Sequence, residues 1–416
     1  MKKDINLLID QAEKDCAEVF AGFEKTERVN TARVMDAFAS RRVAARHFAP
    51  STGYGYDDIG RDTLEIVCAD IFRAEAAIMR PTLSGGTHTL SICLFGLLRP
   101  GDGLLIVTGK PYDTLDSVIG GNGQPGSLME MGVLVRQAEL TPGGSLDIPA
   151  VLGLMNQKTR VVFIQRSRGY ALRPSLMPED MAGLIQAVKT KNPEVFVLVD
   201  NCYGAFVTKD EPTFFGADAA AGSLIKNMGG GLAPTGGYIA GTARAISLIG
   251  NRLTAPGLGR EVGSYEGSYR PFYQGLFMAP HTVCQALKVA ALSARMAEKL
   301  GMQAFPGSMD MRADIIQALV LGSPERVTAY CRGIQSGSPV DAFARPEPWD
   351  MPGYKDQVIM AAGTFVQGAS IELSCDAPMR PPWAVYQQGA LTYESGRRAV
   401  EKAFLALLEV KDAQMD

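Results

Sequence analysis

Short, nearly continuous runs of apolar residues mark the middle of the chain. Leu104–Val107, Val161–Ile164 and Val195–Val199 are runs of this kind. Strands of a parallel sheet are covered on both faces, so they carry apolar side chains at consecutive positions. Stretches with helical character, at residues 88–98 and 176–190, lie between these runs. The alternation predicts an α/β domain built on a mostly parallel sheet.

The two ends of the chain have other patterns. Residues 4–48 place apolar side chains at helical spacing among mixed charges, which predicts a helical arm. After a loop at residues 49–61, Asp62 is expected to cap a helix, with Glu65 three residues later. We therefore expect a helical arm (1–50), a large α/β domain (51–279) and a smaller α+β domain (280–416). The elements expected in the last domain are helices at 280–300, 324–333 and 394–409, strands at 315–321, 358–361 and 371–373, and a proline-rich turn at 378–382.

Composition and charge argue against several classes of function. The chain has 41 Lys and Arg against 44 Asp and Glu, a net charge of −3, which gives no basic surface for nucleic acid or an anionic membrane. Seven cysteines without a Cys-x-x-Cys and only three histidines argue against a disulfide framework or a metal site. We expect Cys202 and Cys375 to be small buried residues. With no secretory or membrane-spanning apolar segment, the sequence predicts a soluble, cytoplasmic protein.

Two segments carry residues suited to chemistry. Asp200 directly follows an apolar strand, at the sheet edge where open α/β folds bind ligands, although it could simply cap a turn. Lys226 lies 26 residues further on, in a stretch with seven glycines between residues 222 and 241. Glycine lets a ligand approach the backbone closely, but a flexible loop with a surface lysine remains an alternative. No phosphate-loop or dinucleotide motif is present there.

Two further segments supply supporting groups. Ser84, Gly85, Gly86 and Thr87 precede the helix at 88–98, and the free N–H groups of a helix start favour an anion. A simple N-cap by Ser84 or Thr87 is the alternative. Tyr112 follows the strand at 104–107 and could stack on a planar ligand or only pack at the rim.

Together these groups are the parts of a pyridoxal phosphate site. The sequence from about residue 50 resembles the fold-type I, γ-subfamily pyridoxal phosphate enzymes, which include the cystathionine lyases and methionine γ-lyase. The resemblance depends mainly on Val-Asp-Asn-x-Tyr at 199–203 paired with Ser-x-x-Lys at 223–226. Residues 371–374, 379–382 and 389–393 resemble the branch described as methionine γ-lyase-like or aluminium resistance proteins. The resemblance implies an aspartate aminotransferase-like large domain followed by a smaller domain.

The resemblance also implies residue roles. Lys226 matches the Schiff-base lysine that moves the Cα proton, and Asp200 matches the acid that keeps the pyridine nitrogen protonated. Tyr112 matches a catalytic tyrosine that stacks on the ring. Tyr56 matches a tyrosine that reaches cofactor and substrate in a neighbouring subunit, which implies a homodimer or homotetramer. The other cofactor-binding residues implied are Ser84, Gly85, Gly86, Thr87 and Ser223.

Two positions depart from the family pattern. Asp58 stands where the lyases have a phosphate-binding arginine, and we consider Arg260 as a replacement. Residues 372–374 read Glu-Leu-Ser where the lyases have Arg-x-Ser, so Arg380 is our candidate for the substrate carboxylate. The implied function is a carbon–sulfur lyase that releases thiol, keto acid and ammonia from a sulfur-containing amino acid by β- or γ-elimination. An aminotransferase or other amino-acid pyridoxal phosphate enzyme, and a non-catalytic binding or regulatory protein of the same fold, are the alternatives.

Overall fold

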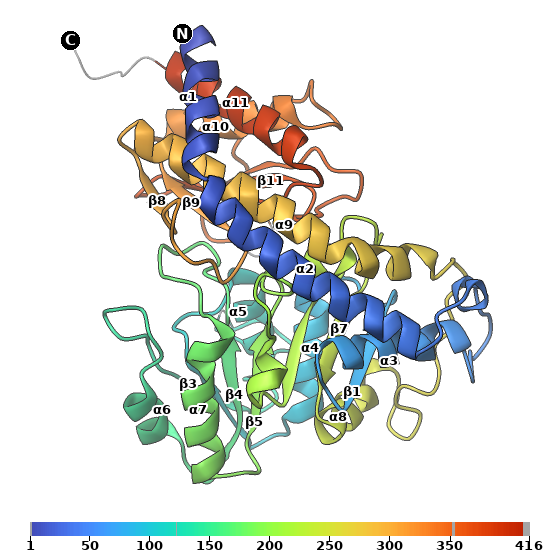
Figure 1. The fold of residues 1–416 in the computed structure, drawn as a ribbon. Helices are drawn as coiled ribbons and strands as arrows, with labels where there is room; N and C mark the ends of the chain where they lie inside the picture. The colour runs from blue at the N-terminus through green and yellow to red at the C-terminus, as the bar shows by residue number, and fades with distance from the viewer. Residues whose placement is uncertain (1, 122, 352–353, 411–416) are drawn as a thin grey trace.

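The computed structural model describes residues 2–121, 123–351 and 354–410 (Figure 1). Its larger layer is a seven-stranded sheet with the order β1-β7-β6-β5-β4-β2-β3. The neighbours from β6 to β3 are parallel, and β7 is antiparallel to both β1 and β6. This arrangement confirms the mostly parallel sheet. The strands are β1 (Ala76–Arg80), β2 (Gly103–Ile106), β3 (Leu134–Gln137), β4 (Thr159–Gln165), β5 (Phe196–Asp200), β6 (Ala219–Ser223) and β7 (Gly237–Gly241).

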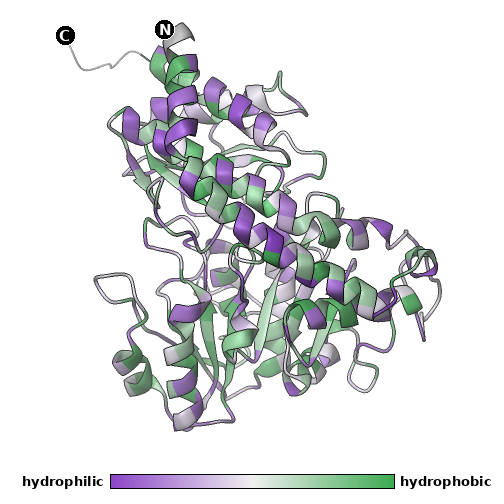
Figure 2. Ribbon diagram, in the orientation of Figure 1, coloured by the Kyte–Doolittle hydropathy of each residue, from purple (hydrophilic) through white to green (hydrophobic). Residues whose placement is uncertain are grey.

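The apolar runs form strands because both faces of the large sheet are covered. Leu105, Val162 and Val197 belong to one buried core, and Leu104 and Val161 belong to a second core on the opposite face. Figure 2 shows the hydrophobic residues along these strands, with hydrophilic residues mixed in along the outer helices. The first face packs against α3 (Ile59–Ile71), α6 (Ile148–Leu154) and α7 (Pro178–Lys191), and the second against α4 (Gly86–Leu97), α5 (Asp113–Ile119) and α8 (Ala243–Leu253).

A second, antiparallel sheet has the order β10-β11-β12-β9-β8. The strand predicted at 371–373 is wrong, because β11 begins only at Ser374. The proline-rich segment at 378–382 is the turn into a strand that was not predicted, β12. The elements are β8 (Gln303–Phe305), β9 (Gln317–Val320), β10 (Val358–Ala361), β11 (Ser374–Pro378), β12 (Ala384–Gln388), α10 (Pro324–Gly337) and α11 (Tyr393–Glu409).

One long helix serves both sheets. α9 (Arg270–Lys299) begins ten residues before the predicted start, and Pro280 lies inside it. Its residues 272–287 belong to a core of the large sheet, and its residues 289–297 belong to the core of the small sheet. The helices α1 (Lys2–Asp15) and α2 (Ala17–Ser40) lie along α9 (Figure 1). The expected boundary at 279/280 falls within α9, and the division into three domains stays a prediction.

The start of α3 differs from the expected one. The cap is Asp58 rather than Asp62, and its carboxylate accepts the Arg61 backbone N–H at 3.0 Å. The Tyr269 hydroxyl donates to the same carboxylate at 2.8 Å, while Asp62 pairs with the Arg61 guanidinium at 2.7 Å. Asp58 therefore holds the helix start from a buried position, which explains why an acid is tolerated where the resembled lyases have an arginine.

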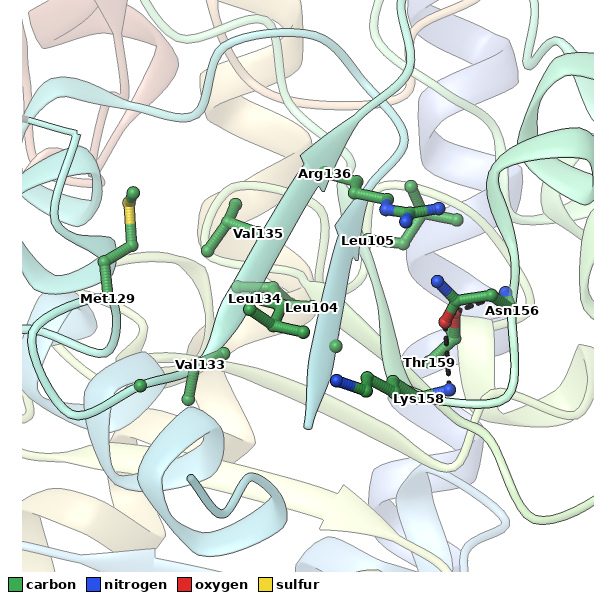
Figure 3. A pocket seen from close by; sticks show the side chains of 12 residues that line it. Leu104, Leu105, Met129, Val133, Leu134, Val135, Arg136, Asn156, Lys158 and Thr159 are labelled. Carbon is green, nitrogen blue, oxygen red and sulfur yellow. Dashed lines mark hydrogen bonds between the residues drawn. The ribbon is translucent and has the colours of Figure 1, made fainter. Parts of the chain in front are cut away.

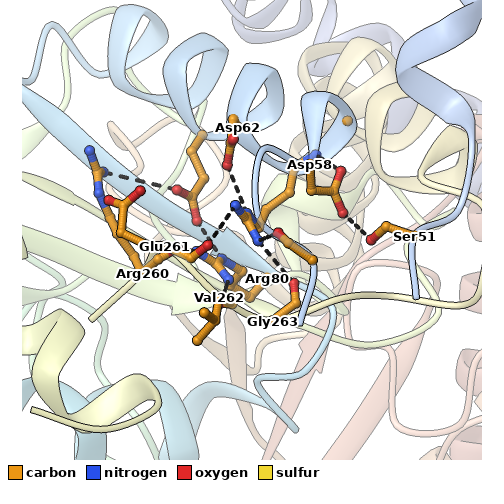
Figure 4. Close-up of polar contacts among 12 residues, drawn as sticks. Ser51, Asp58, Asp62, Arg80, Arg260, Glu261, Val262 and Gly263 are labelled. Atoms are coloured by element: carbon orange, nitrogen blue, oxygen red, sulfur yellow. Dashed lines mark hydrogen bonds and ion pairs between the residues drawn. The ribbon is translucent and has the colours of Figure 1, made fainter. Parts of the chain in front are cut away.

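The Arg61 side chain joins two loops, one of which carries the labelled Glu261 and Gly263 of Figure 4. It is almost fully buried and donates to the carbonyl oxygens of Gly55 at 2.6 Å, Gly263 at 3.2 Å and Glu261 at 3.2 Å. The Gly263 N–H in turn donates to the carbonyl of Tyr54 at 2.8 Å. The loop at 51–57, which carries Tyr54 and Tyr56, is thereby fixed against the loop at 260–265. None of the described helices is long and apolar enough to cross a membrane.

We expect Arg61→Met to lower the free energy of unfolding by about 3 kcal/mol, because it removes a buried cation and the donors of three carbonyl groups. Hydrogen exchange at residues 51–57 should become faster. The control is Arg41→Ala, which removes an exposed ion pair with Asp70 and should cost less than about 1 kcal/mol. Unchanged exchange at 51–57 in Arg61→Met would show that other contacts hold this loop.

Candidate active site

The predicted motifs meet at a cavity of about 100 Å³ at the carboxyl edge of the large sheet. Gln165 ends β4, Asp200 ends β5, and Lys226 follows β6 by three residues. Parallel strands bring their carboxyl ends to one edge, which is where open α/β folds bind ligands. The lining residues are Gly86, Thr87, Leu90, Tyr112, Thr114, Leu115, Gln165, Ser167, Gly169, Asp200, Cys202, Tyr203 and Lys226.

Asp200 is a buried acid that lines this cavity. Its carboxylate accepts the Cys202 backbone N–H at 3.1 Å. Burial raises the pKa of the Asp200 carboxyl, and the nearby Lys226 ammonium opposes that shift. Cys202 is buried as predicted, and it also lines the cavity. Asp200 is therefore placed to pair with a positively charged group of a ligand.

Lys226 faces the same cavity. Its Nζ lies 3.8 Å from the centre of the Tyr203 ring, a cation–π contact. Burial disfavours the charged form, but Tyr203, Cys202 and Asp200 outweigh that effect and raise the pKa of Lys226. The next residue, Asn227, fixes the segment by donating to the carbonyl of Tyr203 at 3.0 Å. The predicted surface-loop alternative for Lys226 is wrong, because the side chain points into a buried cavity.

The N-terminus of α4 opens onto this cavity. A Cβ at Gly86 would lie 2.9 Å from the Cys202 Sγ, so only glycine fits without displacing a neighbour. The same Cβ position is 3.6 Å from the Ser223 Cβ and 4.0 Å from the Lys226 Nζ. The Thr87 hydroxyl is hydrogen-bonded to that of Thr114 at 2.8 Å. Free N–H groups and hydroxyls at a helix start suit an anion such as a phosphate, so the residues present fit the group that the sequence implies.

Several predicted site residues lie away from the cavity of their own chain. The Ser84 backbone N–H donates a hydrogen bond to the His88 Nδ1 at 3.1 Å, and the Ser84 hydroxyl lies at the same distance from that atom. Gly85 immediately precedes Gly86, the first residue of the lining. Tyr56 is 58% exposed. Their predicted roles, and those of the residues inside the cavity, stay predictions.

The two predicted arginines are engaged elsewhere. Arg260 donates to the carbonyl of Ala77 at 2.8 Å and lies beside the Arg61 network (Figure 4). Arg380 forms an ion pair with Asp356 at 2.6 Å, and both side chains are well exposed. Neither lines the cavity, and their predicted roles likewise stay predictions.

Three tyrosines that surround the predicted Tyr112, namely Tyr170, Tyr354 and Tyr386, were not predicted. The hydroxyls of Tyr112 and Tyr354 are hydrogen-bonded at 2.5 Å, and the Tyr112 ring centre lies 5.5 Å from that of Tyr170. Tyr170 in turn packs on Tyr386 of the small sheet at 5.3 Å. One sequence signal was available, because Tyr170 lies in the polar segment that directly follows the apolar run at 161–164.

A buried acid of the small sheet lies next to these tyrosines. The Asp376 Oδ2 accepts hydrogen bonds from the Tyr170 hydroxyl at 3.3 Å and from the Gln388 Nε2 at 3.2 Å. Burial raises the pKa of Asp376 to about 6, although Gln388, Tyr170 and Lys226 act in the opposite direction. This carboxylate was also missed, because β11 and β12 were not placed correctly from the sequence.

A second hollow, of about 470 Å³, lies at the β2–β3 edge of the sheet (Figure 3). Its described lining includes Arg136, Asn156, Lys158 and Thr159, but no acid, histidine or cysteine. Arg136 donates to the carbonyl of Leu154 at 3.0 Å. This hollow brings together no pair of acid and base, so we place the chemistry at the smaller cavity.

The fold defines the structural class of the chain. The chain has the fold of the pyridoxal phosphate-dependent transferases: the protein YhfS of Escherichia coli, a pyridoxal-5′-phosphate dependent protein, is similar with a TM-score of 0.61 at 17% identity, over 92% of this chain and 97% of that chain. At this identity the likeness shows the fold alone.

The chain belongs to the methionine gamma-lyase family, whose model matches residues 5–408. It is 49% identical to the protein YnbB of Bacillus subtilis (strain 168) over 401 residues, which are 96% of this chain and 95% of YnbB. It is similar to a carbon-sulfur lyase involved in aluminum resistance from Clostridium novyi NT, with a TM-score of 0.93 at 43% identity, over 97% of this chain and 95% of that chain.

We expect Asp376→Asn to stabilise the protein above pH 6. The pKa of the carboxyl rises from 3.8 to about 6 on folding, so ionisation costs about 3 kcal/mol of stability, fully present above pH 6 and absent below about pH 4. Asparagine keeps an oxygen for Tyr170 and Gln388 but does not ionise. Urea unfolding of the variant and the wild type between pH 8 and pH 4 should show that the variant has the higher free energy of unfolding, and that this difference shrinks as the pH falls. An advantage that is constant with pH would contradict this account.

Proposed function

We propose that this protein is a pyridoxal phosphate-dependent carbon–sulfur lyase that acts on a sulfur-containing amino acid and releases thiol, keto acid and ammonia. The observation that carries the proposal is the pair of opposite charges, the half-buried Lys226 and the buried Asp200, lining one cavity beside the start of α4. Membership of the methionine gamma-lyase family and the name of the Clostridium novyi relative support the same reaction class.

Each group of the cavity has a proposed task. Lys226 would attach to the cofactor through its Nζ, and Asp200 would hold the pyridine nitrogen in its protonated form. Gly86, Thr87 and Ser223 would bind the phosphate at the start of α4, with Ser84 and Gly85 in the preceding turn. When bound, the cofactor supplies an electron sink that makes loss of the Cα proton feasible. Tyr112 would stack on the ring.

One side chain would move a proton, and a second would donate a hydrogen bond. The Lys226 Nζ, once displaced by the substrate amine, would accept the Cα proton. Burial raises the pKa of Tyr112 well above its ordinary value, so its hydroxyl stays protonated and can donate a hydrogen bond to a departing sulfur. The Tyr354 hydroxyl, 2.5 Å away, can orient that proton. Arg380 remains the predicted residue for the substrate carboxylate, with Tyr56 as a further substrate contact.

The phosphate needs an additional source of positive charge or hydrogen bonds, because Asp58 is an acid committed to the cap of α3. Arg260 is the predicted candidate. Tyr56 is exposed on a loop that Arg61 fixes in place, so it is available to a second copy of the chain. We propose a homodimer or homotetramer in which Tyr56 reaches the cavity of a neighbouring subunit.

We expect borohydride reduction of the cofactor-loaded protein to label Lys226, as shown by peptide mapping. Thiol and keto acid should be released from cystathionine, cysteine or methionine.

Asp200→Asn should lower turnover by a factor on the order of 10²–10³, because a neutral amide gives up most of the charge stabilisation of the ring nitrogen. A label on another lysine would exclude the proposed site, and robust amino transfer without thiol release would favour an aminotransferase.

A site built from two subunits can be tested by co-expressing two variants that are each expected to be inactive, Lys226→Ala and Tyr56→Ala, so that mixed dimers form. If Tyr56 acts across the interface, each mixed dimer has one site with both residues intact. Random pairing should then restore about a quarter of the wild-type activity, since half of the dimers are mixed and half of their sites work. Absence of any restoration in verified mixed dimers would place Tyr56 in its own subunit's site or outside it.

A further inference from the structure

The Lys226 ammonium lies against the face of one aromatic ring. Its Nζ is 3.8 Å from the centre of the Tyr203 ring, while every other cation–π contact among the described residues is 4.5 Å or longer. Tyr203 and Lys226 both line the cavity of about 100 Å³. A cation this close to a ring face is attracted by the negative charge of the π system, and more strongly where water is excluded. The ring therefore touches the atom that the proposed reaction uses.

Contacts on two sides hold the Tyr203 ring in this position. The Asn227 Nδ2 donates to the carbonyl oxygens of Tyr203 at 3.0 Å and Ala205 at 2.9 Å, so the residue next to Lys226 fixes the backbone of Tyr203. The Tyr203 hydroxyl lies 3.5 Å from the Ser370 Oγ, in the segment before β11. The ring also packs against apolar clusters of both sheets. The fold thus fixes the ring face relative to the segment that carries the lysine.

The groups around the Lys226 Nζ differ in charge. Burial raises the pKa of the Tyr203 hydroxyl and raises that of the Cys202 thiol to about 12, so both stay protonated at neutral pH. The acids that act on Lys226 are Asp200, in the cavity, and Asp376, on β11. Under the proposed function, Asp200 is committed to the pyridine nitrogen. The Tyr203 ring then remains in contact with the Nζ, and it supports positive charge there through its face.

We propose that the face of the Tyr203 ring stabilises the ammonium form of Lys226 and so makes the Nζ a stronger base for the Cα proton of the substrate. In that step the Cα–H bond breaks, an N–H bond forms at the Nζ, and the electron pair of the broken bond passes to the cofactor. The contact opposes attachment of the cofactor, because only the neutral amine attacks its aldehyde, with release of one water molecule. This inference rests on the proposed function, since it concerns the same lysine.

Tyr203→Leu should change two rates in opposite directions. Loss of the ring face leaves more Lys226 in the neutral form, so attachment of pyridoxal phosphate at neutral pH should become faster by about threefold or more. Removal of the Cα proton should become slower by about threefold or more, because a weaker base accepts it. Loss of a residue that only fills space would slow both rates.

Attachment can be followed without turnover. The cofactor-free protein is mixed with pyridoxal phosphate, samples are reduced with borohydride at successive times, and the label on Lys226 is quantified by peptide mapping. Proton removal is measured on the cofactor-loaded protein as exchange of the Cα hydrogen of L-alanine in deuterated water, because alanine carries no sulfur leaving group. The matched control is Tyr393→Leu, which removes a half-buried tyrosine that packs on Phe20 and does not line the cavity. It should leave both rates unchanged.

Two replacements separate the ring face from the hydroxyl group and from the shape of the side chain. Tyr203→Phe keeps the face and should retain both rates within about twofold. Pentafluorophenylalanine at position 203 has nearly the same shape as phenylalanine, but its fluorine atoms withdraw negative charge from the face, so it should reproduce the effect of Tyr203→Leu. Equal rates for these two rings would overturn the inference, even if Tyr203→Leu did not fold.

The outcomes distinguish this inference from the proposed function. If both rates fall together in Tyr203→Leu, or if neither changes, the ring face does not act on the base and the lyase proposal is untouched. If Tyr203→Phe behaves like Tyr203→Leu, the hydroxyl group carries the effect and the inference is wrong. If the wild type takes no label on Lys226, the proposed function itself is overturned.

Discussion

The placement of two opposite charges in one buried cavity is the constraint on which the rest of the site depends. Either Asp200 or Lys226 alone would be costly to bury, but together they compensate each other. β5 and β6 are adjacent and parallel, so the residues that follow them meet at one edge. Gly86 then keeps the backbone of α4 clear of Cys202. The sheet order and the glycine together allow these two charges to meet at one cavity.

The sequence predicted this part of the molecule because its signals are local. The apolar runs of β2, β4 and β5 need no knowledge of distant contacts. Asp200 ends β5, and Lys226 follows β6 by only three residues. The opposite side of the site could not be predicted in the same way. Asp376 and Gln388 lie on strands that flank a proline-rich turn. The packing of the two sheets brings Asp376 within hydrogen-bond distance of Tyr170, beside the cavity. The cap of α3 was misassigned because burial, rather than spacing, selects Asp58 over Asp62.

Two polar clusters of the structure show opposite ways of using burial. The Arg61 guanidinium is surrounded by carbonyl groups and an acid, and this pairing stabilises the loops that it joins. The Asp376 cluster instead holds a buried acid with a raised pKa, and ionisation of this acid lowers the stability of the fold.

The helix α9 has a consequence for how the chain reaches its native state. Because successive turns of this one helix complete the cores of both sheets, neither core is closed until α9 has been synthesised. During translation, the apolar residues that α9 covers in these two cores therefore stay uncovered until this helix has left the ribosome. Apolar surface that is exposed in this transient way is prone to aggregation.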